Sequence, residues 1–139
     1  MSLELREFRP TDIASVVNLW VSADGIELDS SDAPEALASF LKRNPGLSTI
    51  AYLNSSLAGA ALCGHDGRRG LLHHLAVADF ARRQGVGRAI IERCLSGLRN
   101  AGIIKCHALV FRDNRFGELF WKPTGWDFRE KVALYSRFV

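Results

Sequence analysis

Two glycines separated by one residue stand among arginines in residues 82–89, RRQGVGRA. Apolar residues then recur every four positions, at Val86, Ile90, Cys94 and Leu98, which predicts a helix that begins beside the glycines. The first turn of a helix presents main-chain N–H groups without partners and the positive end of the helix dipole. Glycines let a ligand approach such a backbone closely. The stretch predicts an anion-binding loop, with an ordinary strand-to-helix turn carrying solvated arginines as the alternative.

The residues around these glycines exclude two common phosphate loops. A P-loop requires Lys and then Ser or Thr after its last glycine, but Arg88 and Ala89 follow Gly87. A dinucleotide-binding loop requires a third glycine, where this chain has Ile90. It also requires an acidic residue about twenty positions later, where Phe111 stands. A different phosphate ligand is therefore expected.

Hydrophobic periodicity predicts the elements that position this loop. We expect strands at 3–9, 47–54, 56–65, 71–78 and 105–111, and one or two more within 126–139. We expect helices at 9–23, 33–44 and from the glycine loop to Gly102, with a short helix at 114–122. Strands 71–78 and 105–111 read as buried on both faces and joined by a helical crossover. The fold class is α/β (α+β), a mixed and mostly antiparallel sheet flanked by helices.

Composition limits the function classes. The 139 residues are 47% hydrophobic and 24% charged, as in one ordinary globular domain spanning 1–139. No window has the ~18 consecutive apolar residues of a membrane span, and the charged N-terminus does not read as a targeting peptide. Three cysteines without paired spacing suit reduced thiols in the cytoplasm. A net charge of +3 does not by itself indicate a nucleic-acid partner. Whether two copies form a homodimer stays open.

Three segments together resemble the GCN5-related N-acetyltransferase (GNAT) family. Residues 75–103, LAVADFARRQGVGRAIIERCLSGLRNAGI, resemble its acetyl-CoA motif: a strand ending in LAV, R/Q-x-x-G-x-G/A, then a helix. Residues 114–126, NRFGELFWKPTGW, resemble its second signature, and residues 6–20, REFRPTDIASVVNLW, its opening strand and helix. The resemblance covers nearly the whole chain in the right order. It implies a single GNAT-like domain whose central parallel strands splay apart.

The resemblance also implies where acetyl-CoA binds. Main-chain N–H groups of residues 83–88 would hold the pyrophosphate, while the backbone of Leu75, Ala76 and Val77 pairs with the pantetheine arm and Asn114 lies beside it. The cofactor-binding candidates in the loop are Arg82, Arg83, Gln84, Gly85, Val86, Gly87 and Arg88. No metal is expected, because the spacing of His65, His73, His74 and His107 does not converge on a zinc site.

The chemistry requires a base and a hydrogen-bond donor. An alkyl amine, with a pKa near 10.4, must lose a proton before it attacks a thioester. His73 stands where related arylalkylamine acetyltransferases carry a histidine, and we expect it to be the base, with simple packing as the alternative. Adjacent strand residues point to opposite faces, so only one of His73 and His74 is expected to face the site, and His74 to lie hydrogen-bonded under a helix. The N–H near Val77 is the candidate donor to the thioester oxygen.

The chain departs from the family pattern at the residue proposed to act as general acid, which protonates the leaving thiolate of coenzyme A. Many members carry a tyrosine, proposed to protonate the leaving thiolate, where this chain has Trp121. An indole N–H donates a hydrogen bond but does not act as an acid at neutral pH. The thiolate then leaves unassisted, or Tyr135 or water substitutes. A non-catalytic acyl-CoA-binding domain of the same fold is the alternative function.

The acceptor is the least determined part. The segment 23–35, ADGIELDSSDAPE, is acidic and includes Glu27, which favours a cationic amine, with a solvated loop as the alternative. Trp20 and Trp121 either line an apolar acceptor pocket or fill the core. A nucleic-acid-binding module using the arginines of residues 68–69 and 82–88 is disfavoured, because no aromatic residues are interleaved with them as stacking platforms.

Overall fold

The structure, a computed structural model, describes residues 2–112 and 120–139. The chain divides into two compact units, Met1–Leu109 and Val110–Val139. The first unit holds a five-stranded sheet and three α-helices, α1 (Ile13–Ser22), α2 (Pro34–Arg43) and α3 (Val86–Asn100). The second unit contains the 3-10 turn η4 (Lys122–Thr124), which follows helical residues 120–121.

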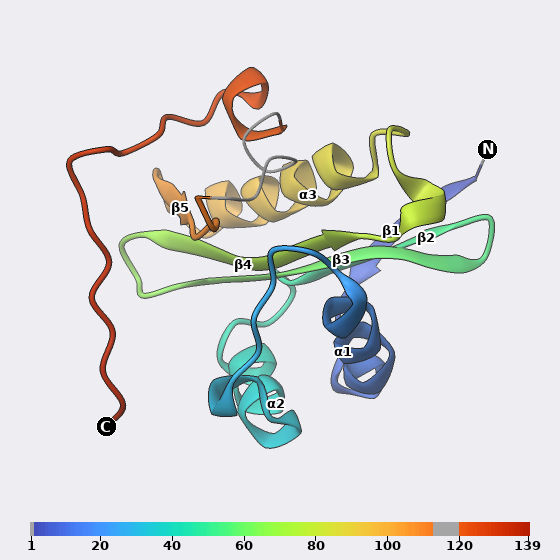
Figure 1. Ribbon diagram of the computed structural model, residues 1–139, viewed down its shortest axis with the longest axis horizontal. Coiled ribbons are helices and arrows are strands. Elements are labelled where there is room, and N and C mark those ends of the chain that lie inside the picture. The colour runs from blue at the N-terminus through green and yellow to red at the C-terminus, as the bar shows by residue number, and fades with distance from the viewer. Residues whose placement is uncertain (1, 113–119) are drawn as a thin grey trace. The chain divides into compact units, whose positions relative to one another are not determined.

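The sheet is mixed and mostly antiparallel, as the sequence predicts. Its spatial order is β1 (Leu3–Glu7), β2 (Thr49–Leu53), β3 (Ser56–His65), β4 (Gly70–Val77) and β5 (Cys106–Ala108) (Figure 1). Neighbours pair antiparallel except β4 and β5, which are parallel and joined through α3. The predicted β-helix-β crossover is therefore confirmed, but among the described residues the parallel pair lies at one edge of the sheet and not at its centre, as the family resemblance implies.

Helices cover both faces of the sheet in the first unit. α1 and α2 lie against one face and α3 against the other (Figure 1). Each helix buries the apolar stripe that its sequence period predicts: Val16 and Trp20 of α1, and Leu37 and Leu41 of α2, join one core cluster. α3 buries Val86, Ile90, Ile91, Cys94 and Leu98. This packing fixes the start of α3 close to the end of β4, because only η3 (Asp79–Ala81) and a short turn separate them.

A β-bulge interrupts β4. His73 pairs with Leu62, and Ala76 pairs with Ala60, so two residues of β4 lie opposite one residue of β3. Within the bulge, His74 has a φ of +56°, a left-handed conformation that is rare for residues other than glycine. The bulge breaks the simple alternation of side chains along β4.

β5 is shorter than the sequence predicts. It contains three residues of intermediate burial, whereas Leu109 is 47% exposed, so the expected buried strand at 105–111 is wrong beyond Ala108. The parallel ladder joins Gly70, Leu71 and Leu72 to β5 and stops there. Residues 73–77 of β4 therefore have no β5 partner, and the splaying of the two strands that the family resemblance implies stays a prediction.

The predicted strands in residues 126–139 are also wrong. The described residues after Trp126 form no strand, and Tyr135 and Phe138 are 92% and 79% exposed. A strand requires a neighbour for its main-chain N–H and C=O groups. The backbone hydrogen bond found within this segment, from Val132 N–H to the Arg129 carbonyl, is local. Alternating apolar residues did not suffice to build a strand here.

Candidate functional site

Six consecutive main-chain N–H groups at the start of α3 point to no acceptor. Gly85 has a φ of +80° and precedes the helix, and the first backbone bond of the helix runs from Ala89 N–H to the Gly85 carbonyl. Within residues 2–112 and 120–139, the main-chain N–H groups of residues 83–88 have no hydrogen-bond acceptor. Such a row of donors, at the positive end of a 15-residue helix, is suited to bind an anion.

The side chains of the loop differ in their environment. Arg82 Nε lies 3.3 Å from Asp79 Oδ1, and Gln84 Nε2 donates to the Phe80 carbonyl at 3.0 Å. Arg83 and Arg88 are exposed. Arg82 and Gln84 thus brace the turn between β4 and α3, whereas Arg83 and Arg88 extend into solvent, where they are available to phosphate groups.

The edge of β4 beyond the β5 ladder offers further main-chain groups. Just after β4, Ala78 N–H donates to the carbonyl of Ala58 in β3 and so points toward β3. Because main-chain groups alternate in direction along a strand, those of Val77 and Leu75 point away from β3, toward the edge that β5 leaves. Along the chain, η3 and a short turn join this edge to the loop of residues 83–88, so a ligand extended along both would meet both sets of donors.

The two adjacent histidines lie on the same side of the sheet, against the expectation that only one does. The His73 ring meets Phe40 of α2 edge to face, at 6.3 Å between centroids, and the His74 ring meets Trp20 of α1 at 5.1 Å. The β-bulge at His74 is the cause, because it rotates that side chain back to the face that His73 occupies.

His74 has a hydrogen-bonded position between strand and loop. Its Nε2 lies 2.9 Å from Oδ1 of Asp32, which belongs to the 3-10 turn η2 (Ser30–Asp32) before α2. Both side chains are largely buried, at 20% and 10% exposed. This arrangement matches the hydrogen-bonded histidine expected from the sequence. The partner could not be foreseen, because Asp32 lies 42 positions away and reads as a helix cap.

His73 is held in its neutral form. Burial is the main cause that lowers its pKa from the usual 6.5, the neighbouring His74 adds to the decrease, and Asp32 opposes it. The imidazole of His73 is consequently unprotonated at neutral pH and has the form that accepts a proton.

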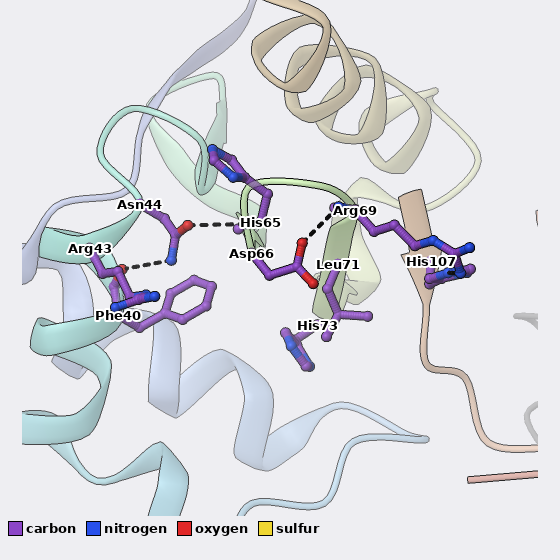
Figure 2. A pocket seen from close by; sticks show the side chains of 11 residues that line it. Phe40, Arg43, Asn44, His65, Asp66, Arg69, Leu71, His73 and His107 are labelled. Atoms are coloured by element: carbon purple, nitrogen blue, oxygen red, sulfur yellow. Dashed lines mark hydrogen bonds between the residues drawn. The ribbon is translucent and has the colours of Figure 1, made fainter. Parts of the chain in front are cut away.

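His73 also forms part of a pocket of about 390 Å³. The pocket lies between the end of α2, the β3–β4 turn and the parallel strands, and Figure 2 shows Phe40, Leu71 and His73 together along one part of its lining. Its other polar side chains are Arg43, Asn44, His65, Asp66, Arg69 and His107. Most of these residues were not singled out as site candidates, since no local motif links them.

The predicted acceptor residues of the first unit lie outside this lining. Trp20 is fully buried in the core, beside Phe8, so its burial supports the core-filling alternative and not contact with an acceptor. Glu27 is exposed, as is most of the acidic segment. Asp29 caps η2 through Ser31, and Asp32 binds His74. The acids therefore brace the loop or face solvent.

The remaining candidate residues lie in the second unit or outside the described residues. Asn114 lies outside the described residues. Trp121 is half-buried within a cluster of aromatic rings, at 5.1 Å from Phe120 and 4.9 Å from Trp126. Tyr135, the suggested substitute acid, is exposed in the second unit.

Residues 2–112 and 120–139 contain no group of three or more His, Cys, Asp or Glu side chains arranged to hold a metal ion. None of the helices in the same ranges is long and apolar enough to span a bilayer.

Known proteins match this arrangement. Residues 13–126 match the acetyltransferase (GNAT) family. An acetyltransferase of Pectobacterium atrosepticum is 31% identical over 112 residues, which are 81% of this chain and 79% of the relative. An acetyltransferase of Yersinia pestis is 26% identical over 137 residues, 99% of this chain and 96% of the relative.

A solved structure shares the fold. The PaiA N-acetyltransferase of Thermoplasma acidophilum, in complex with coenzyme A, superposes with a TM-score of 0.77 at 19% identity, over 90% of this chain and 89% of that one. The family match covers most of the sequence, from residue 13 in the first unit to residue 126 in the second. The chain therefore belongs to the acetyltransferase (GNAT) family and is an acetyltransferase that takes its acetyl group from acetyl-CoA.

Proposed function

We propose that the protein transfers the acetyl group directly to a primary amine of a small molecule or protein, with His73 as general base. One observation carries the proposal: the donors of residues 83–88 continue into the open edge of β4, at whose start lies a neutral histidine. The loop binds the pyrophosphate, and the groups of Leu75 and Val77 bind the pantetheine amides. The thioester then lies near His73.

The chain's own groups account for each proton. His73 accepts the proton of the ammonium or of the attacking nitrogen, directly or through a water molecule. Val77 lies four residues along β4 from His73, about 13 Å, so within this proposal its N–H binds the pantetheine arm and does not reach the thioester oxygen, the role that the sequence suggested for it. The C–S bond breaks as the C–N bond is completed, and the thiol product has a pKa near ~8.5, so its thiolate leaves without a strong acid. The absence of tyrosine at position 121 is compatible with this step.

The release of free coenzyme A thiol tests the proposal. With acetyl-CoA and a panel of amines, thiol should appear in step with an acetylated amine. Binding of acetyl-CoA without thiol release for any amine would instead support the alternative, a non-catalytic acyl-CoA-binding domain. The observation that favours this alternative is Trp121 at the family's tyrosine position.

Arg88 is expected to contact the 3′-phosphate of coenzyme A. It is exposed in the first turn of α3, near the proposed pyrophosphate site. Arg88→Ala should weaken coenzyme A binding about tenfold and dephospho-coenzyme A much less, because one charge-assisted contact is lost. Calorimetric titration of both nucleotides measures the difference. Arg99→Ala, an exposed arginine in the last turn of the same helix, is the control, and equal losses for both nucleotides would place Arg88 elsewhere.

Several finer points belong to the same proposal. The two units belong to one acetyltransferase domain in this proposal, since the family match runs from residue 13 in the first unit into the second, as far as residue 126. The three cysteines are free thiols, which supports a reducing compartment such as the cytoplasm.

The exposed acids of residues 24–35 would attract a cationic amine at long range, and the amine panel includes such compounds. Nucleic acid is not among the proposed partners, and a homodimer would show in sedimentation.

A further inference from the structure

Two arginines and one aspartate are the fully charged side chains that line the pocket beside His73. Arg43 and Arg69 carry full charges, whereas Asp66 is the one acidic side chain of the lining. Asp66 is committed to its own turn: its Oδ1 accepts the main-chain N–H groups of Arg68 and Arg69, both at 2.8 Å. The pocket therefore presents more positive than negative charge to a ligand.

Neither guanidinium has an ion-pair partner within the part of the chain that the structure describes. Arg69 is half-buried, and its Nη1 donates to His107 Nε2 at 3.2 Å, which keeps the guanidinium against β5. A partly desolvated cation without a counter-ion is unfavourable. An anionic ligand group would supply that counter-ion, and guanidinium matches carboxylate and phosphate in geometry.

The position of Arg69 relative to the reaction sets the shape of the ligand. His107 lies opposite Leu71 in the parallel ladder, and Leu71 is two residues before His73 on the same face of β4, a step of about 7 Å. The ladder ends at Leu72, so the open edge for the thioester begins at His73. Arg69 thus lies at the far end of the pocket from the expected thioester.

We propose that this pocket binds the acceptor and selects small primary amines that carry an anionic group, a carboxylate or a phosphate, a few bonds from the nitrogen. The anionic group contacts Arg69, with Arg43 adding charge at the rim, and the amine reaches His73. Phe40 and Leu71 line the pocket with apolar surface for the intervening carbons (Figure 2). This inference rests on the proposed amine acetylation.

The acidic segment does not oppose this selection within the pocket. None of its carboxylates is among the lining residues. Asp32, the member nearest the histidines, already binds His74 Nε2. The negative charge of the segment affects how a ligand approaches the protein, whereas the positive charge of the pocket stabilises the ligand once it is bound.

An acceptor panel provides the first test. It contains glycine, β-alanine and γ-aminobutyrate, the matching carboxamides, O-phosphoethanolamine with ethanolamine, and diamines such as putrescine. An anionic amine should exceed its neutral counterpart in kcat/KM by about tenfold or more, because a charge-assisted contact is lost in the neutral compound. If the ratio of kcat/KM between the anionic and the neutral amine is larger for the amino acids and their carboxamides, the anionic group that the pocket binds is a carboxylate. If it is larger for O-phosphoethanolamine and ethanolamine, the group is a phosphate.

Arg69→Gln provides the second test, with Arg68→Gln as its matched control. Arg68 is exposed, lies in the same turn and does not line the pocket. Arg69→Gln should lower about tenfold the ratio of kcat/KM for the anionic amine to kcat/KM for its neutral counterpart, because the charge-assisted contact is lost. Arg68→Gln should leave this ratio unchanged.

Calorimetric titration of the best anionic amine into the protein with coenzyme A tests the pocket without turnover. Binding should be weakened by Arg69→Gln and not by Arg68→Gln. Equal effects of the two variants, equal binding of the anionic and neutral amines, or a preference for diamines would each overturn the inference while thiol release still supports amine acetylation. Absence of thiol release with every amine would overturn the proposed function, and the titration would still decide the ligand class of the pocket.

Discussion

Replacing Gly87 with aspartate is expected to remove coenzyme A binding while the protein stays folded. The substitution places a carboxylate within the row of N–H donors of residues 83–88, where the pyrophosphate is expected. Two unit charges about 4 Å apart repel by several kcal/mol at the effective dielectric of a protein surface, so affinity should fall by about a hundredfold or more. Titration calorimetry with coenzyme A measures the loss.

The same substitution is favourable for folding, which separates binding from stability. Gly87 is the second residue of α3, and acidic side chains stabilise the first turn of a helix by about 0.3–1 kcal/mol. The melting temperature of Gly87→Asp should equal or exceed that of the unsubstituted protein. Gly87→Ala, which adds a methyl group without charge, is the control and should retain most of the affinity. Full affinity in Gly87→Asp would show that the diphosphate binds at another surface.

Local sequence patterns predicted most elements of the first unit. Helix α3 followed from a four-residue apolar period and from Gly102, which ends the helix at a φ of +83°. The hairpin of β2 and β3 followed from two apolar runs around Asn54 and Ser55, which both adopt positive φ values. Apolar periods and turn residues of this kind lie within a few residues of one another, so they can be identified from the sequence alone.

The bulge and the pocket depend on pairings that the sequence does not contain. Two histidines in a row read as opposite faces of a strand, and only the register of β4 against β3 places both rings on one side. The pairs Asp32 with His74 and Arg69 with His107 join positions 42 and 38 residues apart. Their approach follows from the packing of α2 and from the crossover, not from a motif.

The errors at the C-terminal end have a related cause. The apolar residues 108–111 and the alternating residues 132–139 have the composition of strands. Composition selects strand only when a neighbouring backbone completes the ladder. Leu109, Leu134 and Tyr135 are exposed instead. The roles of Leu75, Val77 and residues 83–88 came from the family resemblance and stay predictions, and the structure places their main-chain groups at the end of β4 and the start of α3.

Substitution of His73 by glutamine should lower kcat about a hundredfold, the usual contribution of a general base. Glutamine keeps a hydrogen-bonding side chain of similar length but does not accept a proton at neutral pH. Binding of acetyl-CoA should change little, because its proposed contacts are main-chain groups. His65→Gln is the control: this histidine lines the same pocket, but its Nδ1 accepts the Gly67 N–H of its own turn.

The pH dependence of kcat/KM distinguishes a base from a packing residue. His73 acts as a base only when unprotonated, and burial together with His74 lowers its pKa below 6.5. Activity should therefore fall as the pH decreases below 6.5 through that pKa, in addition to the slope from the amine's own titration near pH 10. His73→Gln should lose the limb below pH 6.5 and keep the alkaline one, whereas His65→Gln should keep both. If His73→Gln retained both limbs, a water chain would carry the proton and His73 would only pack against Phe40, because a packing role changes the rate without moving a pKa from the profile.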